Sequence, residues 1–177
     1  RGNRGGEGKD EFAGEDRYDA VHGVSLLKAL SGKEKVHVYG FSRGGLMALW
    51  TAIMRDDIAS VVIWAGVSDV EGTYEERLDM RRGLKRIIGG TPSKYPERYA
   101  YRTPLYEIEK IDAPVLIIHG ISDEHVDISH GYKLMEALEK AGKQVVSNFE
   151  ENLQHHFPTK ENRQTVRMLS EWMKLQL

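Results

Sequence analysis

The alternation of two apolar patterns limits the fold of this chain more than any other feature of its sequence. Four short runs rich in Val and Ile are typical of β-strands. They lie at 35–39, 59–66, 114–120 and 144–149. Longer stretches with apolar residues at helical spacing separate them. Strands that alternate with helices favour right-handed crossovers, so we expect an α/β fold with a mostly parallel sheet and helices on both faces.

The segment from about 68 to 111 departs from this alternation. It is rich in charged residues and is interrupted by Gly89-Gly90 and by several prolines. We interpret it as a lid-like excursion between two strands, a common place for a lid or a specificity loop. No linker or internal repeat divides the remaining sequence, so residues 1–177 are expected to form a single domain.

Composition excludes several classes of function. The 25 Lys and Arg residues nearly balance 27 Asp and Glu, so neither nucleic acid nor a membrane surface is an expected partner. The sequence has no cysteine, which excludes disulfides, iron–sulfur clusters and thiolate zinc sites, and no cofactor is expected. No apolar run approaches the ~20 residues that cross a bilayer. The lack of cysteine is compatible with a cytoplasmic location, which is our expectation.

A serine lies where the first predicted strand meets an apolar helix. Ser42 is the centre of the motif Gly40-Phe41-Ser42-Arg43-Gly44, which has the pattern G-x-S-x-G of a nucleophile on a tight turn. The small residues Gly40 and Gly44 would let strand and helix pass closely, and the backbone N–H of Arg43 would face a developing oxyanion. The simpler interpretation is a glycine-rich turn in which Ser42 caps the helix.

A serine hydroxyl needs a base, and the base needs a carboxylate to orient it. In the fold expected here these residues follow the serine in the order acid, then histidine, each after a later strand. Asp123 follows the third predicted strand and His155 follows the fourth. The sequence therefore predicts Ser42 as nucleophile, Asp123 as orienting acid and His155 as base.

Other residues could take these roles. Glu124, Asp127 and Asp69 are alternative acids, although helix capping or solvation explains Asp69 better. His156 is the alternative base, because position in the sequence alone does not separate it from His155. The pair of histidines has no third ligand at metal spacing, so no metal site is expected. The remaining histidines are expected to be structural or exposed: His22, His37, His119, His125 and His130.

Together these motifs resemble the α/β-hydrolase superfamily and, within it, the catalytic domain of the prolyl oligopeptidase (S9) family. The resemblance rests on Arg1–Gly6, Gly40–Gly45, Tyr101–Leu105, Ala113–Gly120 with Asp123 and Val126, and His155–Phe157. It implies the same triad of Ser42, Asp123 and His155, with His156 in a position usually held by glycine.

The resemblance also implies what the sequence lacks. Family members usually carry a propeller domain, and their fold places several strands, with a turn that supplies a second oxyanion donor, before the segment that resembles Arg1–Gly6. We therefore expect this chain to be the C-terminal two-thirds of a hydrolase domain, with its N-terminal strands absent. A further segment or another chain would supply them, because the strand at 35–39 would otherwise have a bare edge.

The expected function is that of a serine hydrolase that cleaves an ester or a peptide bond through an acyl-enzyme, as S9 peptidases do. The expected partner is a small-molecule ester or a short peptide. The alternatives are a small carboxylesterase or thioesterase of the same fold and a non-catalytic hydrolase-fold module, which would not need all three residues. A basic cluster in the excursion is better explained as a solvated helix face than as a site for an acidic substrate: Arg81, Arg82, Lys85 and Arg86.

Overall fold

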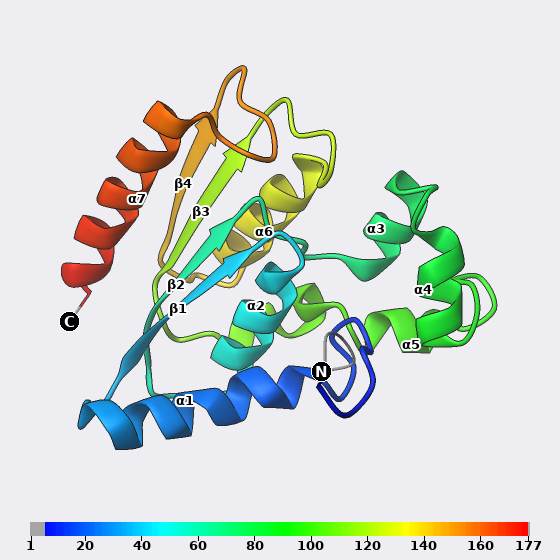
Figure 1. Ribbon diagram of the computed structural model, residues 1–177, viewed down its shortest axis with the longest axis horizontal. Helices are drawn as coiled ribbons and strands as arrows, with labels where there is room; N and C mark the ends of the chain where they lie inside the picture. The colour runs from blue at the N-terminus through cyan, green and yellow to red at the C-terminus, as the bar shows by residue number, and fades with distance from the viewer. Residues whose placement is uncertain (1–5, 177) are drawn as a thin grey trace.

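The computed structural model describes residues 6–176 and contains one sheet of four parallel strands (Figure 1). The strand order in the sheet is the order in the chain. The strands are β1 Val36–Phe41, β2 Ile58–Trp64, β3 Val115–Gly120 and β4 Val145–Glu150. Their carboxyl ends lie at one edge of the sheet, so the loops that follow them meet there. The α/β class with a parallel sheet is confirmed.

Alternating side chains of the strands build two separate apolar layers. In β2, Val61 and Ile63 pack on one face, against a core that helices α1, α2 and α6 help to form. Val62 and Trp64 face the other side and pack with α7. Because both faces of β2 are covered, every residue of the strand is buried, and all but Ser60 are apolar, as the sequence pattern predicts. The helices are α1 Arg17–Ser31, α2 Gly44–Met54, α6 Ser129–Lys140 and α7 Thr159–Lys174.

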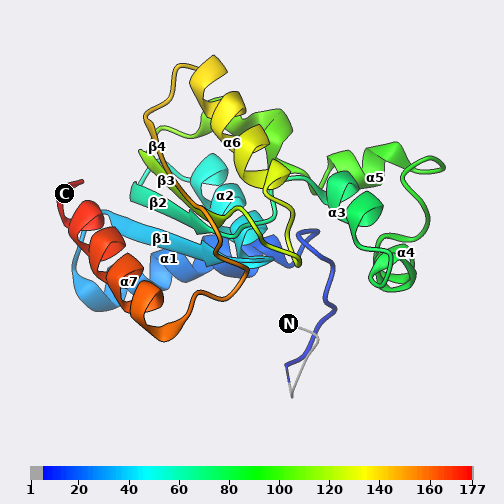
Figure 2. The same ribbon diagram turned by 90° about the horizontal axis from the view of Figure 1, so that it is seen from above.

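The excursion at 68–111 forms four short helices; the first three extend beyond one side of the sheet (Figures 1 and 2), and the fourth packs against α2 and α6. Tyr99 and Leu84 bury their side chains in a third apolar cluster with Trp50 of α2 and Phe12 of the N-terminal segment. This cluster fixes the excursion to the domain. Its helices are α3 Val70–Glu76, α4 Arg81–Ile88, α5 Pro96–Ala100 and the 3₁₀ helix η1 Pro104–Lys110. Of the segment Arg1–Gly6 that contributes to the family resemblance, residues 1–5 lie outside the described residues.

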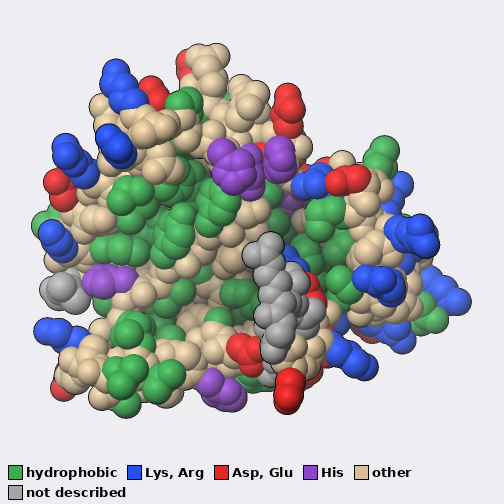
Figure 3. Space-filling model, in the orientation of Figure 1, with side chains coloured by type: hydrophobic (Ala, Val, Ile, Leu, Met, Phe, Trp, Pro, Cys, Tyr) green, Lys and Arg blue, Asp and Glu red, His purple; other side chains and the backbone are tan. Residues whose placement is uncertain are grey.

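Within residues 6–176, β1 pairs on one side only, with β2. Beside its free edge, a groove between α1 and β1 contains Val24, Leu27 and Val38. The helical periodicity of α1 places Leu27 on the same face as the buried Val24, yet half of the surface of Leu27 is exposed. Figure 3 shows apolar side chains gathered on the side of the molecule that carries this groove. Pairing of this edge with a further segment or chain stays a prediction.

None of the helices in the described part of the chain is long and apolar enough to cross a membrane.

Candidate active site

Ser42 occupies the turn between β1 and α2 with a strained backbone. Its φ is 55°, a left-handed conformation that few residues other than glycine adopt. Hydrogen bonds hold this conformation: the Ser42 N–H donates to Trp64 O at 3.0 Å, and its carbonyl accepts from the N–H of Gly45 and Val67 at 2.9 and 3.0 Å. The turn projects Ser42 at the carboxyl edge of the sheet, as expected of a nucleophile on such a turn.

The glycines around Ser42 differ in what they provide. A Cβ on Gly40 would lie 2.5 Å from the carbonyl oxygen of Gly44, so strand and helix approach too closely for any side chain there. A Cβ on Gly44 would meet nothing within 4 Å, so the expectation that Gly44 must be small is not supported. The crowded helix position is Gly45, whose Cβ would lie 2.8 Å from Gly66 Cα. Sequence reasoning missed it because the contact comes from the loop after β2.

The structure brings Ser42, Asp123 and His155 together. Nε2 of His155 lies 3.0 Å from Oγ of Ser42, although the two residues are 113 positions apart in the sequence. Nδ1 of the same ring lies 2.7 Å from Oδ2 of Asp123. The loops after β3 and β4 carry Asp123 and His155 to this edge, because parallel strands end there together. The contacts form one line from carboxylate to imidazole to hydroxyl.

Asp123 is 8% exposed and its carboxylate is fully engaged. Oδ1 accepts hydrogen bonds from the backbone N–H groups of His125 and Val126 at 2.8 and 3.0 Å. Burial by itself would raise the pKa of Asp123, but the N–H groups of His119, Val126, His155 and His125 around the carboxylate outweigh burial and lower it. Asp123 is therefore ionised beside His155.

Burial lowers the pKa of His155 below its ordinary value, against the opposing effect of Asp123. The ring is therefore neutral at pH 7. Since a carboxylate can only accept, Nδ1 carries the proton and Nε2 presents a lone pair to Ser42. This is the protonation state that a general base needs.

His156 does not reach Ser42. It is exposed, and its ring packs edge-on against that of His155, with centroids 5.0 Å apart. His125 stacks on His155 at 5.0 Å. Figure 3 shows histidine side chains gathered on this part of the surface. Among the residues described by the structure, no group of three or more His, Asp or Glu side chains is arranged to hold a metal ion.

The alternative acids have other partners. Asp69 accepts from Gly72 N at 3.0 Å as the N-cap of α3. It also pairs with Lys133 at 2.7 Å, so capping explains it, as the sequence suggests. Asp127 accepts from Ser129 N at 2.9 Å, and Glu124 is exposed. Within residues 6–176, none of these three carboxylates is hydrogen-bonded to His155.

The other histidines away from the site range from buried to exposed positions. His130 is 1% exposed, with Nε2 at 3.0 Å from Glu76 Oε1. His37 contacts Ser60 through Nδ1 at 2.8 Å, and His22 is exposed.

Arg43 links the turn to the N-terminal segment. Its guanidinium pairs with Asp10 at 2.7 Å and lies over the ring of Phe12. No hydrogen bond from its backbone N–H to another described residue is present, which leaves that N–H available beside Ser42. The sequence gives no sign of this role for Asp10, since nothing local connects it to position 43.

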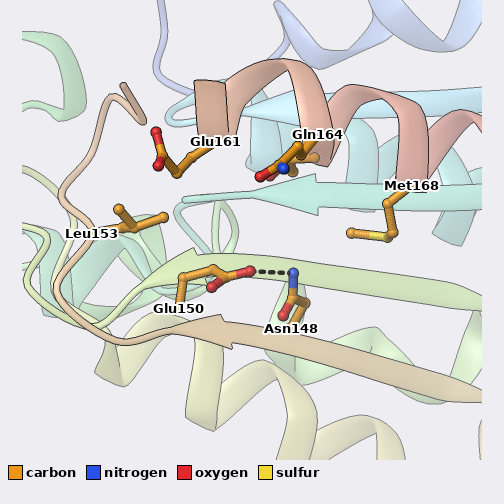
Figure 4. A pocket seen from close by; sticks show the side chains of 7 residues that line it. Asn148, Glu150, Leu153, Glu161, Gln164 and Met168 are labelled. Atoms are coloured by element: carbon orange, nitrogen blue, oxygen red, sulfur yellow. Dashed lines mark hydrogen bonds between the residues drawn. The ribbon is translucent and has the colours of Figure 1, made fainter. Parts of the chain in front are cut away.

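Two hollows lie near this edge of the sheet. One is next to His155 and is lined by aromatic residues, among them Tyr39, Phe41 and Trp64. The other lies between α7 and β4, where Asn148 donates to Glu150 at 2.9 Å (Figure 4). The lining of this second hollow includes none of Ser42, Asp123 and His155, so it is separate from the line of contacts.

The basic cluster of the excursion lies mostly in solvent. Arg82, Lys85 and Arg86 are exposed. Arg81 donates to Tyr74 O at 2.9 Å and is thereby held within the excursion itself. This placement fits a solvated helix face.

The sequence of this chain is similar to a known protein family and to a named peptidase. Residues 6–177 match the family model described as "Prolyl oligopeptidase family". The chain is 52% identical to "Uncharacterized peptidase YtmA" of Bacillus subtilis (strain 168), over 98% of this chain and 69% of that protein.

Solved structures share the fold. Pyrococcus horikoshii acylaminoacyl peptidase superposes with a TM-score of 0.79 at 20% identity, over 90% of this chain and 27% of that one. A puromycin hydrolase superposes with a TM-score of 0.78 at 24% identity, over 93% of this chain and 25% of that one. The chain thus spans about a quarter of the length of these proteins. It has the α/β-hydrolase fold and belongs to the prolyl oligopeptidase (S9) family of serine peptidases, which are hydrolases.

Proposed function

We propose that this protein hydrolyses an ester or peptide bond through an acyl-enzyme formed on Ser42. The observation that carries the proposal is the line of contacts from Asp123 through His155 to Ser42, with distances of 2.7 and 3.0 Å. Three residues from three distant loops form the series of carboxylate, imidazole and hydroxyl that nucleophilic catalysis requires. In this series the imidazole can accept the proton of the hydroxyl.

The mechanism follows from the lone pair on His155. Nε2 takes the hydroxyl proton as Oγ of Ser42 attacks the carbonyl carbon, and Asp123 stabilises the resulting imidazolium. The N–H of Arg43 donates to the oxyanion, an interaction worth about 3 kcal/mol in comparable sites. The imidazolium then protonates the leaving group, and water hydrolyses the acyl-enzyme with His155 again as base.

We favour a peptide or a related amide as substrate, because the family is one of peptidases and the relative of 52% identity is named a peptidase. A small carboxylesterase or thioesterase is the alternative, since an ester carbonyl would use the same residues. A non-catalytic module is the second alternative, but it would not require a buried carboxylate aligned with a buried imidazole. A cytoplasmic location stays a prediction.

The decisive experiment is labelling with a fluorophosphonate probe, which reacts with activated serines. We expect the wild-type protein to be labelled, and Ser42→Ala to stay folded and unlabelled. Persistent labelling of Ser42→Ala would refute the assignment. His155→Gln and His156→Gln form a matched pair of neighbouring substitutions. The first should abolish labelling and the second should leave it within about threefold, because only His155 reaches Ser42.

Substrate class is tested with p-nitrophenyl esters and with aminoacyl and Pro-linked p-nitroanilides, which release p-nitrophenol and p-nitroaniline respectively. A peptidase turns over the amides, and Ser42→Ala removes that activity. Hydrolysis of the esters alone would favour the esterase.

A further inference from the structure

His119 lies behind the proposed triad, at the end of β3, and its side chain is completely buried. Its Nε2 is 2.9 Å from the backbone oxygen of Val126 and 3.4 Å from Oδ2 of Asp123. From the sequence alone, His119 is expected to be a structural histidine, because the end of a buried strand is an ordinary place for one. The structure shows that it contacts the same carboxylate oxygen that faces His155.

These contacts fix the protonation state of His119. A carbonyl oxygen only accepts hydrogen bonds, so Nε2 must carry the proton that it donates to Val126. Nδ1 is buried and has no hydrogen-bond partner among residues 6–176. Gly131 packs against it so closely that a Cβ there would lie 3.2 Å away. A second proton on Nδ1 would be a buried donor without an acceptor, which is costly, so the ring is a neutral donor.

His119 also completes a closed set of contacts around the acid. Val126 donates its N–H to Oδ1 of Asp123, while its carbonyl accepts from His119. His119 in turn lies against Oδ2. The loop between Asp123 and Val126 is thus tied to the strand that precedes it, and both oxygens of the carboxylate have a fixed neighbour.

We propose that His119 is a positioning residue of the hydrolase site, whose Nε2–H holds the Asp123 carboxylate and the Val126 carbonyl so that Oδ2 stays directed at His155. This inference rests on the proposed function. A neutral donor suits this role, because it orients Asp123 without neutralising the charge that stabilises the imidazolium. A cation in the same place would compete with His155 for that charge.

The test compares His119→Gln with His119→Met. The two side chains are similar in length and volume, but only Gln can donate a hydrogen bond from the position of Nε2. We expect His119→Met to lower kcat/KM by about 10- to 100-fold, because a misdirected carboxylate leaves His155 misaligned. We expect His119→Gln to retain activity within about threefold of wild type.

A second readout separates positioning from a loss of stability. Asp123 opposes the burial that lowers the pKa of His155, so a misdirected carboxylate should move the NMR titration of His155 to lower pH, by roughly 0.5 unit or more. Other groups near His155 are His125 and His156, which neither variant changes. His130→Met serves as the control, since it removes an equally buried imidazole elsewhere and should leave the His155 titration unchanged.

Two results would overturn the proposal. One is a folded His119→Met variant whose His155 titration and rate per labelled serine equal those of wild type. The other is a wild-type NMR spectrum in which His119 carries its proton on Nδ1 or is charged near pH 7; this measurement needs no variant to fold. If the wild-type protein hydrolyses no substrate and takes up no fluorophosphonate, the proposed function fails. The His155 titrations of the two variants then still decide the role of His119.

Discussion

Replacement of Asp123 by Asn tests the proposed mechanism most sharply, because the structure dictates how the new amide will sit. Two backbone N–H groups, from His125 and Val126, point at Oδ1. The amide oxygen of Asn must take that place, which puts its NH₂ group where Oδ2 now lies, 2.7 Å from Nδ1 of His155.

This orientation inverts the polarity of the base. Nδ1 of His155 would have to accept a hydrogen bond from the amide, so the ring proton moves to Nε2. Nε2 then faces the hydroxyl of Ser42, at 3.0 Å, as a donor and cannot take its proton. The same wrong tautomer lowers kcat about 10⁴-fold in a serine protease triad, which corresponds to about 5 kcal/mol of transition-state stabilisation.

The measurement is kcat on the best substrate of the ester and amide panel, with circular dichroism to show that each variant is folded. Asp127→Asn is the matched control, because it makes the same chemical change at an exposed acid in the same loop. We expect Asp127→Asn to stay within about twofold of wild type. A loss smaller than tenfold in Asp123→Asn, or comparable losses in the two variants, would refute the reasoning.

Three further predictions concern pH and stability. Burial lowers the pKa of His155, and His155 must be neutral to act as a base. We therefore expect kcat/KM to rise with pH and to reach half its maximum below pH 6.5, the ordinary pKa of histidine. A half-maximum above about pH 7 would contradict this prediction. In urea denaturation, Gly40→Ala should lose about 2 kcal/mol or more and Gly44→Ala less than about 0.5 kcal/mol, because only the first has no room for a Cβ; similar losses would argue against the observed geometry. Hydrogen bonds from Arg55 and, to a smaller extent, from Lys28 lower the pKa of Asp57 in the folded protein. The charge of Asp57 therefore stabilises the fold at pH values above the pKa of an Asp in the unfolded chain, which is about 3.9. This stabilisation is lost as the pH falls through the lower pKa that Asp57 has in the folded protein. Asp57→Asn should therefore cost about 1 kcal/mol near pH 7 and progressively less below about pH 4, and an equal cost in strong acid would count against the ion pairs.

The general arrangement of the site follows from local sequence patterns. The Val- and Ile-rich runs that become β1 to β4 can be recognised without reference to distant residues, because the periodicity of apolar side chains is a local property. A G-x-S-x-G motif between a strand and a helix, followed by acidic residues and histidines after later strands, places the proposed catalytic residues on one edge of the sheet. The parallel topology makes that edge common to all of them.

What the sequence by itself determined was the α/β class, the family resemblance and the small set of residues from which a site could be built. Only the tertiary structure decided that His155, rather than His156, reaches Ser42, since burial of Phe157 against Trp64 fixes which way the loop after β4 presents each ring. The same holds for the crowding at Gly45 and for the contact of His119 with Asp123. Each of these depends on distances of a few ångströms between segments that the chain brings together only on folding, and such distances leave no periodic signal in a single sequence.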